Sequence, residues 1–381
     1  MKVVHICLSC FYIDGYSYQE NILVRKHVEL GHDVTVIAST ENYDNRRKLT
    51  YVEPSTYIGG DGATVMRIPY RNIINHSISK KLRVHNGLNS ILKELQPDIV
   101  MFHGLCGWEL KTVVNFCKKR TSVKLYIDSH EDHNNSARSF ISKNLLHRLY
   151  YKNVIQSCLK DIDKILCISL DVKKFVSEFY GVPNEKLDFF PLGGEVFSDQ
   201  EYNLRRFNKR CELNVNNENL IFFQSGKFNQ RKKIIQSLEA FINISDSNSY
   251  LFLAGDFDEE VRSQCYELIE SHERIVFLGW QDSNEIRNLL CAADVYVQPG
   301  TQSATMQMSI CARCVVIIDN VLSHVPFVQG NGYLLDEKRT LEDAFSELIS
   351  NKDYLENMSN ASLSIAYDLV DYNKLARRIV E

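Results

Sequence analysis

The chain has 381 residues, of which 44% are hydrophobic and 24% charged, and a formal net charge of −4 at pH 7. This length predicts about two domains, and the mildly acidic charge argues against nucleic acid as a partner. No apolar run approaches the roughly 20 residues that span a bilayer, and the first residues carry no secretory cleavage site. We therefore expect a cytoplasmic protein.

The first half of the chain alternates between strand and helix patterns. An apolar run over residues 2–8 leads into a loop rich in Tyr and Gly, a helical pattern over 19–30 and a β-branched strand over 33–38. Further strands are predicted at 65–68, 99–102, 124–127 and 164–168, and helices at 80–95, 107–119, 143–159 and 170–179. Such alternation is typical of a parallel sheet with helices on both faces.

Residues 196–219 are polar and break this pattern, which predicts a linker and the start of a second domain. Alternation then resumes, with strands predicted at 219–224, 250–254, 275–278, 295–298, 315–319 and 332–334. We therefore expect two doubly wound α/β domains in tandem. Because such sheets bind ligands beyond the carboxyl ends of their strands, the two domains are expected to face a central cleft.

The most informative segment is PGTQSATMQ, residues 299–307, which follows an apolar strand and precedes a helical pattern. Unpaired backbone N–H groups and the helix dipole favour an anion at such a turn. Gln302 and Gln307 add amide groups that suit sugar or ribose hydroxyls. The alternative is an ordinary turn with Ser303 or Thr305 as the helix N-cap.

Several segments, in chain order, carry a family resemblance. In the first half they are YQENILVRKHVELGHDVTVIAS (18–39), QPDIVMFHG (96–104) and FFPLGGEVF (189–197). In the second half they are QSGKFNQRKK (224–233), FLGWQ (277–281), AADVYVQPG (292–300) and QMSICARCVVI (307–317). Together they resemble the retaining nucleotide-sugar glycosyltransferases of family 4, which have the GT-B fold.

This resemblance implies an acceptor-side Rossmann-like domain over residues 1–195 and a donor domain over 196–364. A helix of about residues 365–381 is expected to pack back on the first domain. It also implies a retaining, metal-independent transfer of a hexosyl or acetylhexosaminyl group. The donor would be a UDP- or GDP-linked sugar with no further cofactor, and the acceptor a glycan or lipid-linked molecule in surface polysaccharide synthesis.

The donor site implied by the resemblance contains Lys227 and Lys232 as catalytic cations that neutralise the diphosphate. Lys233 replaces Lys232 if the alignment is shifted by one residue, and a solvated basic patch is the alternative. The other donor-binding residues are expected to lie on the glycine-containing strand end and on the turn of residues 299–307. They are Gly226, Gln302, Ser303, Ala304, Thr305 and Gln307.

Two histidines follow predicted strands of the first domain. His103 is expected to face the cleft and to hydrogen-bond a sugar hydroxyl or the developing charge, and a core or capping histidine is the alternative. His130 is a second strand-end histidine on the acceptor side. The remaining acceptor-side candidates lie in the loop and helix start after the first strand, namely Asp14, Gly15, Tyr16, Gln19 and Glu20.

Metal binding is not expected. Two Cys-x-x-Cys pairs begin at Cys7 and Cys311, far too distant in sequence for a zinc ribbon, and their apolar neighbours predict reduced, buried thiols. His130 and His133 lack a third ligand at a recognisable spacing. Asp256-Phe-Asp258 only superficially matches the metal motif of the other glycosyltransferase fold.

One departure from the family motif leaves alternatives open. The family carries two glutamates, of which the second aligns with Gln307, while the first has no counterpart because Pro299 stands near its place. A glutamine supplies no negative charge to stabilise oxocarbenium character. The alternatives are a sub-branch of the family with its own donor-binding loop, a catalytically impaired binding or scaffold protein, and a phosphorylase or epimerase of similar fold.

Residues 76–95 raise the question of membrane contact. They carry Lys80, Lys81, Arg83 and His85, followed by apolar residues at helical spacing. A basic amphipathic helix of this kind can rest on anionic lipid, which predicts a peripheral location at the membrane. A plain surface helix with one core face is the alternative.

Overall fold

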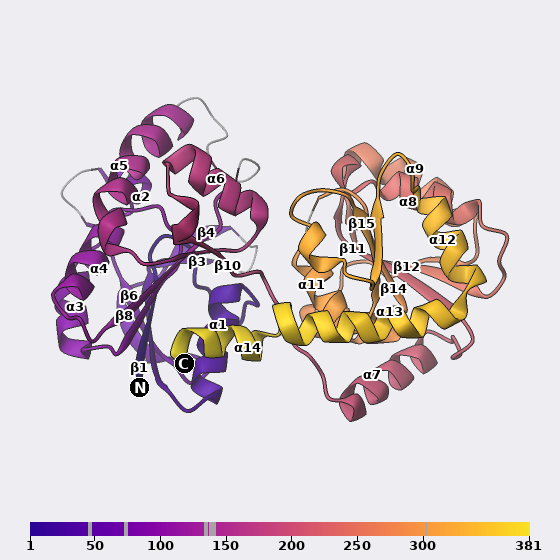
Figure 1. Ribbon diagram of the computed structural model, residues 1–381, viewed down its shortest axis with the longest axis horizontal. Helices are drawn as coiled ribbons and strands as arrows, with labels where there is room; N and C mark the ends of the chain where they lie inside the picture. Colours follow the sequence, from indigo (N-terminus) through magenta and orange to yellow (C-terminus); the bar gives the residue numbers. More distant parts are fainter. Residues whose placement is uncertain (45–47, 72–74, 133–135, 137–141, 302) are drawn as a thin grey trace. The chain divides into compact units, whose positions relative to one another are not determined.

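The computed structural model describes residues 1–381 apart from 45–47, 72–74, 133–135, 137–141 and 302. It consists of two compact α/β units (Figure 1). Unit 1 comprises Met1–Pro191 together with Leu375–Glu381, and unit 2 comprises Leu192–Lys374. The chain thus enters unit 2 shortly before residue 196, and its last residues belong to unit 1.

Unit 1 is built on an eight-stranded sheet with the order β10-β9-β8-β7-β1-β2-β6-β5. Neighbouring strands are parallel except β5 and β6. A separate antiparallel pair, β3 (Glu41–Tyr43) and β4 (Leu49–Tyr51), was not predicted. The eight strands are β1 (Lys2–Cys7), β2 (Asp33–Ser39), β5 (Ser55–Ile58), β6 (Thr64–Ile68), β7 (Ile99–Phe102), β8 (Lys124–Ser129), β9 (Ile165–Cys167) and β10 (Leu187–Phe189).

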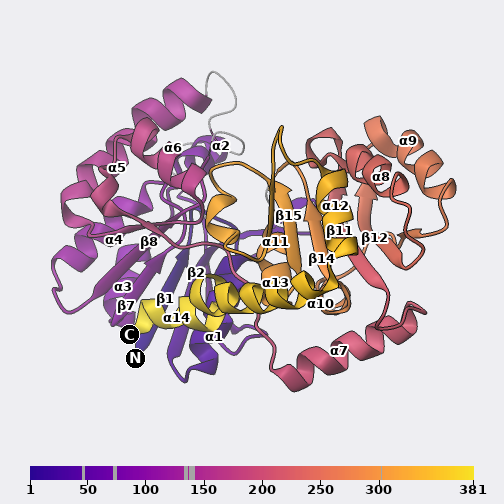
Figure 2. The ribbon, with the colours of Figure 1, turned by 45° about the vertical axis from the view of Figure 1, so that its right-hand side comes forward.

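Alternation along β1 sends its side chains to two different environments. Val4 and Ile6 belong to the main core cluster, together with residues of the helices α3 to α6. His5 points to the opposite face because successive side chains of a strand alternate. There it contacts His27 of α1, and His27 in turn contacts α14, which lies beside α1 (Figure 2). The helices are α1 (Gln19–Glu29), α2 (His76–Leu82), α3 (Leu88–Leu95), α4 (Glu109–Lys118), α5 (Lys152–Cys158), α6 (Leu170–Tyr180) and α14 (Tyr372–Val380).

Two long helices predicted for unit 1 differ in the structure. The helix expected over 80–95 is interrupted between α2 and α3, where Arg83 (φ +53°) and Gly87 (φ +79°) adopt left-handed backbone conformations. The helix expected over 143–159 starts as a π-helix (Ser142–Tyr151) and continues as α5. Short-range periodicity does not reveal such breaks, because the apolar spacing continues through them.

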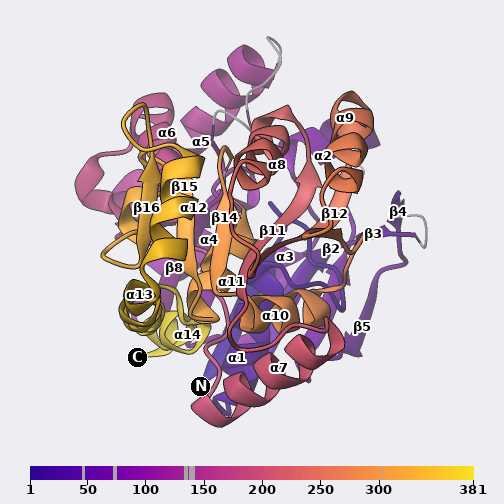
Figure 3. The ribbon, with the colours of Figure 1, turned by 90° about the vertical axis from the view of Figure 1, so that its right-hand side faces the viewer.

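Unit 2 contains a six-stranded, fully parallel sheet with the order β13-β12-β11-β14-β15-β16 (Figure 3). The strands are β11 (Leu220–Phe228), β12 (Ser249–Phe257), β13 (Ile275–Phe277), β14 (Val295–Gln298), β15 (Val315–Asp319) and β16 (Gly332–Leu335). The helices are α7 (Asp199–Glu212), α8 (Ile234–Ile242), α9 (Glu259–Glu270), α10 (Ser283–Ala292), α11 (Ala304–Cys311), α12 (Leu341–Ser350) and α13 (Lys352–Ile365).

The prediction of a linker over residues 196–219 is wrong for most of that range, because α7 occupies it. The Ser198 hydroxyl caps this helix by accepting a hydrogen bond from Glu201 N. The inner face of α7 carries Arg206 and Arg210, whose guanidinium groups lie 2.5 and 2.7 Å from the carboxylate of Asp294. The helix therefore packs through Arg210, which is buried, and Arg206, which is partly buried. Its sequence lacks the apolar stripe that identifies most surface helices.

Among the described helices, none is long and apolar enough to cross a membrane. All eleven cysteines are free thiols, and all except Cys211 are at least partly buried. In both sheets the parallel strands carry their carboxyl ends to one edge, where the loops with the predicted site residues begin.

Candidate active-site residues in the two units

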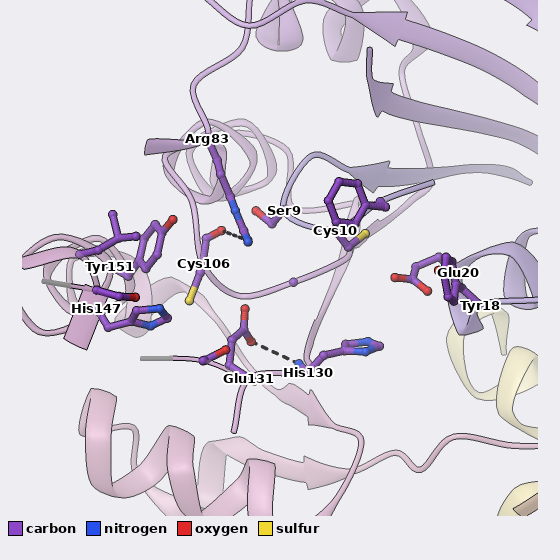
Figure 4. A pocket seen from close by; sticks show the side chains of 15 residues that line it. Ser9, Cys10, Tyr18, Glu20, Arg83, Cys106, His130, Glu131, His147 and Tyr151 are labelled. Atoms are coloured by element: carbon purple, nitrogen blue, oxygen red, sulfur yellow. Dashed lines mark hydrogen bonds between the residues drawn. The ribbon is translucent and has the colours of Figure 1, made fainter. Parts of the chain in front are cut away.

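Unit 1 contains a cavity of about 1040 Å³ beyond the carboxyl ends of β1, β7 and β8. Figure 4 shows its polar side chains in two groups. Glu20 and His130 lie at one end, and Arg83, His147 and Tyr151 lie at the other. Carboxylate, imidazole, guanidinium and phenol groups around one cavity can hydrogen-bond a polyhydroxylated ligand.

The structure separates the predicted acceptor-side residues into two sets. Glu20 and His130 line the cavity. Asp14, Gly15, Tyr16 and Gln19 do not: Asp14 Oδ2 accepts from the hydroxyl of Tyr57, and Gln19 Nε2 donates to Pro191 O at 3.2 Å. The rings of Tyr16 and Tyr18 are tilted toward each other with centroids 5.3 Å apart, and Gly15 allows a turn with φ +77°.

His103 is placed differently from the expectation that it faces an open cleft. Its side chain is fully buried, and both of its ring nitrogens have partners. Nδ1 lies 2.6 Å from Asp128 Oδ2, and Nε2 lies 2.9 Å from His5 Nδ1. His103 therefore has no ring nitrogen free for a substrate, and the alternative of a core histidine describes its position.

Asp128 connects His103 to the cavity. Its Oδ1 accepts a hydrogen bond from Gly104 N at 2.7 Å and lies 3.6 Å from Nε2 of His130. Although burial opposes the charged forms, Asp128 raises the pKa of both histidines to about 9. The two histidines in turn hold the pKa of the Asp128 carboxyl well below its usual range, against the effect of its burial.

Several residues of this cavity were not predicted from the sequence. Glu131 directly follows His130, and its Oε2 accepts from Ser129 Oγ at 2.6 Å. Arg83 reaches the cavity from the break between α2 and α3 and donates to Cys106 O at 2.8 Å. Glu131 could have been identified from the sequence, because it lies in the polar segment SHEDH that follows a predicted strand. Nothing in the sequence indicates the turn that orients Arg83.

In unit 2, the turn after β14 is organised by Gln298, which is fully buried. Its Nε2 donates to Thr301 O at 2.7 Å, and its Oε1 accepts from the hydroxyls of Tyr296 and Ser303. Ser303 occupies the N-cap position of α11, but its side chain makes no capping hydrogen bond. Ala304 and Thr305 form the first turn of α11, and Gln302 lies outside the described residues.

Lys232 is brought against this same turn. Its Nζ donates to Thr301 O at 2.7 Å, and Thr301 N donates to Arg231 O at 3.2 Å. Gly300 makes the close approach possible, because a Cβ there would lie 1.9 Å from Arg231 O. Burial lowers the pKa of Lys232 to about 8, so this ammonium group lies in a poorly solvated place.

The other two candidate lysines point elsewhere. Lys233 Nζ lies 2.6 Å from Asp319 Oδ2, so Lys232 is the one of the two neighbours that meets the turn. Lys227 follows Gly226 at the end of β11, its side chain is 69% exposed, and its Nζ lies 3.3 Å from Asp258 Oδ1. Lys227 is thus a solvated cation at the strand end.

Among the described residues of the predicted donor site, Gln307 is the least satisfied polar side chain. It is fully buried on α11, and neither its amide nitrogen nor its amide oxygen has a hydrogen-bond partner in the described part of the chain. Unpaired buried polar atoms cost about 1–3 kcal/mol and are rare in native proteins. The amide can both donate and accept a hydrogen bond, and both of its polar atoms are covered by protein atoms.

No group of three or more His, Cys, Asp or Glu side chains within the described ranges could hold a metal ion. Asp256 and Asp258 have local contacts instead. Asp256 Oδ1 accepts from Phe257 N at 2.9 Å and lies 3.6 Å from Arg262, while Asp258 stands at the N-cap position of α9.

Solved structures with the same fold cover nearly the whole chain, although their sequences are only distantly related. A glycosyltransferase from Rickettsia africae matches with a TM-score of 0.67 at 14% identity, covering 100% of this chain and 96% of its own. HepE of Anabaena, solved with UDP, matches with a TM-score of 0.64 at 13% identity, covering 100% and 98%. WaaG, a glycosyltransferase involved in lipopolysaccharide biosynthesis, matches with a TM-score of 0.60 at 15% identity, covering 99% and 98%.

No curated protein matches the sequence of this chain. Two family models do, one in each half. Residues 22–193 match the model of Glycosyltransferase Family 4, and residues 205–364 match that of Glycosyl transferases group 1. Both predicted domains are therefore matched by glycosyltransferase models, and the chain belongs to the family 4 type of glycosyltransferase with the GT-B fold.

Proposed function

We propose that the protein transfers a sugar from a UDP- or GDP-linked donor to a glycan or lipid-linked acceptor, with retention of configuration and without a metal ion. The observation that carries this proposal is Gln307, a buried amide that has no hydrogen-bond partner among the described residues and that follows the turn contacted by Lys232. HepE, which shares the fold, was solved with UDP and with UDP-glucose. WaaG, described as taking part in lipopolysaccharide biosynthesis, supports a role in surface polysaccharide synthesis.

The proposed donor site uses charge and backbone dipoles together. Lys232 and the N–H groups at the start of α11 neutralise the diphosphate, and Gln307 hydrogen-bonds hydroxyls of the ribose or the sugar. In the reaction, the bond between the anomeric carbon and the phosphate oxygen breaks while the acceptor oxygen bonds to the same face. The acceptor proton goes to the departing phosphate oxygen. Positioning and electrostatics therefore supply the catalysis.

Replacing Gln307 by alanine tests the donor site. We expect Gln307→Ala to lower kcat/KM for donor hydrolysis about 10- to 100-fold, because one side chain loses two hydrogen bonds to the ligand. Gln329→Ala changes an exposed glutamine of the same unit and should leave turnover unaltered. Donor hydrolysis by both variants, measured across several nucleotide sugars, decides whether Gln307 belongs to the donor site.

The same experiment distinguishes the enzyme from a binding or scaffold protein. If the unaltered protein binds UDP by calorimetry but hydrolyses and transfers no donor, the scaffold alternative is correct. Equal activity in Gln307→Ala and the unaltered protein would exclude Gln307 from the donor site.

An apolar groove next to the cavity of unit 1 favours a lipid-linked acceptor over a free glycan. This groove has a volume of about 500 Å³ and is lined mainly by apolar side chains of α2 and the π-helix, with Lys81 among them. Ser142 and Leu146 line both hollows, so the polar cavity and the apolar groove adjoin. An acceptor with a polar head and a hydrocarbon chain matches this arrangement.

Paired acceptors test this preference. We expect an acceptor with a prenyl chain to have a KM at least about 10-fold lower than the same sugar without the chain, because burying each CH₂ contributes about 0.8 kcal/mol. Leu145→Ser in the groove should reduce this difference without changing donor hydrolysis. Equal KM values for the two acceptors would favour a free glycan.

The basic helix expected to rest on a membrane has a different structure. Lys80 is paired with Glu41 at 2.7 Å, and Leu88 and Leu92 of α3 are buried in the core. Peripheral membrane contact is therefore proposed only for the exposed apolar residues Ile78, Leu145 and Leu149 around the groove. Co-sedimentation with anionic vesicles should weaken in Ile78→Ser if this contact forms.

A further inference from the structure

A row of buried imidazoles runs through unit 1, beginning at its C-terminal helix. His27 Nε2 lies 3.0 Å from Ala376 O of α14, and His27 Nδ1 lies 2.9 Å from His5 Nε2. His5 Nδ1 lies 2.9 Å from His103 Nε2, and His103 Nδ1 lies 2.6 Å from Asp128 Oδ2. All three histidines are fully buried.

The two ends of this row determine how many protons it holds. The carbonyl of Ala376 can only accept a hydrogen bond, and so can the ionised carboxylate of Asp128. Four hydrogen bonds between these two acceptors require four protons, whereas three neutral imidazoles carry only three. One histidine must therefore be doubly protonated, and the row as a whole carries one positive charge opposite the charge of Asp128.

Distance from the carboxylate decides which histidine is charged. His103 alone contacts Asp128 directly, so the cation is most stable there. Burial lowers the pKa of His5 well below its ordinary value and that of His27 to about 4. His27 and His5 are then neutral, each carries its proton on Nε2, and each accepts at Nδ1.

We propose that His27, His5 and His103 form a hydrogen-bonded chain that holds one proton against Asp128 and thereby limits how strongly Asp128 stabilises a proton on His130 in the cavity. His130 lies beside the same carboxylate, with Nε2 3.6 Å from Asp128 Oδ1. Two cations compete for that carboxylate. The proton held on His103 reduces the attraction of Asp128 for a proton on His130, and His5 maintains this state by accepting from His103 Nε2.

The remaining titratable and charged groups around the chain come from α1, α14, the end of β1 and the segments that follow α1 and β8. On α1, Lys26 is paired with Glu29 at 2.8 Å, and on α14 Arg378 is paired with Asp188 at 3.1 Å. The groups whose charge is felt by the chain or by His130 come from the end of β1, from α1 and from the segments that follow α1 and β8. They are Cys7, Glu20, His32 and Glu131.

The side chain of residue 5 offers a matched pair of variants. In His5→Leu, His103 Nε2–H has no acceptor, so His103 loses its second proton and Asp128 becomes free to stabilise a cation on His130. His5→Gln preserves the chain, because an amide oxygen can accept from His103 while its N–H donates to His27. A purely structural role for His5 would not distinguish the two variants by the charge of His130.

The experiment follows the imidazole resonances of His130 against pH in the full-length protein, assigned with His130→Gln. We expect the pKa of His130 to rise by about half a unit or more in His5→Leu and to stay unchanged in His5→Gln. Equal values in the two variants would overturn the proposal. This measurement needs no sugar donor, so it is independent of the proposed transferase activity.

A second measurement on the unaltered protein covers the case in which His5→Leu does not fold. Nitrogen-15 NMR of the histidine rings should show two protonated nitrogens on His103 at pH 7.5, and one, Nε2, on each of His5 and His27. A single proton on His103, or a protonated Nδ1 on His5, would contradict the proposed chain.

Discussion

Replacing Lys232 by alanine is expected to lower kcat/KM for sugar transfer about 100- to 1000-fold, as for the loss of a preorganised charge that acts on a leaving group. The cation lies against the turn after β14, where its Nζ contacts Thr301 O. Lys233→Ala is the matched control, because that side chain is directed to Asp319. Steady-state kinetics of both variants with the same donor give the comparison.

The comparison of the two variants decides whether Lys232 or Lys233 is the catalytic cation of the donor motif. A loss in Lys233→Ala that equals or exceeds the loss in Lys232→Ala would show that Lys233 is the catalytic cation. If neither variant changes turnover, the basic residues after β11 form a solvated patch. Lys227→Ala is expected to have a smaller effect than Lys232→Ala, since the Lys227 side chain is 69% exposed and its charge is screened by water.

The lowered pKa of Lys232 predicts how nucleotide binding depends on pH. With a pKa of about 8 in the unliganded protein, Lys232 is partly neutral above that pH. A bound diphosphate favours the charged form, so binding takes up a proton. UDP affinity should therefore fall as pH rises through 8, and calorimetry should show this dependence disappearing in Lys232→Arg, whose guanidinium stays charged.

Removing the buried carboxylate of Asp128 should produce the largest loss of stability. Asp128→Ala is expected to lower the free energy of unfolding by about 3–5 kcal/mol, because it leaves the His103 proton without a counter-charge and Gly104 N–H without an acceptor. Asp128→Asn should cost much less, since its amide can donate to a neutral His103 and accept from Gly104. Denaturant unfolding followed by circular dichroism measures both.

The raised pKa of His103 also predicts how the stability of the protein changes with pH. The pKa of His103 is about 9 in the folded protein, above its ordinary value of about 6.5. Its stabilising contribution is therefore fully present below about pH 6.5 and is lost as pH rises toward 9. Asp128→Asn should remove this decline. A decline of the same size in Asp128→Asn would show that another group causes it.

The parallel sheets of both units could be predicted from the sequence because buried parallel strands are nearly continuous apolar runs, as at Ile99–Phe102 and, up to its final glutamine, Val295–Gln298. The α7 helix could not, because its inner face is formed by Arg206 and Arg210 rather than by apolar residues. The break at Arg83 was also missed, since a left-handed backbone conformation at arginine has no sequence signal.

In the candidate site, too, features that depend on local sequence patterns could be predicted, whereas contacts between distant parts of the chain could not. The turn that begins after β14 and its neighbour Lys232 follow from the positions of strand ends, which local patterns predict. The burial of His103 does not, because it depends on His5 and His27, which adjoin it only in the folded sheet. His5 lies in an apolar strand. Side-chain alternation along that strand indicates which face of the sheet His5 points to, but not which residues it contacts.

The most direct test of the proposed function follows the anomeric configuration of the product by proton NMR while free nucleoside diphosphate is quantified. We predict that the transferred sugar keeps the configuration of the donor, that one nucleoside diphosphate appears for each sugar transferred, and that Gln307→Ala and Lys232→Ala slow both together. An inverted product would contradict the retaining mechanism. Failure to turn over or bind any UDP- or GDP-linked sugar would contradict the proposed function itself.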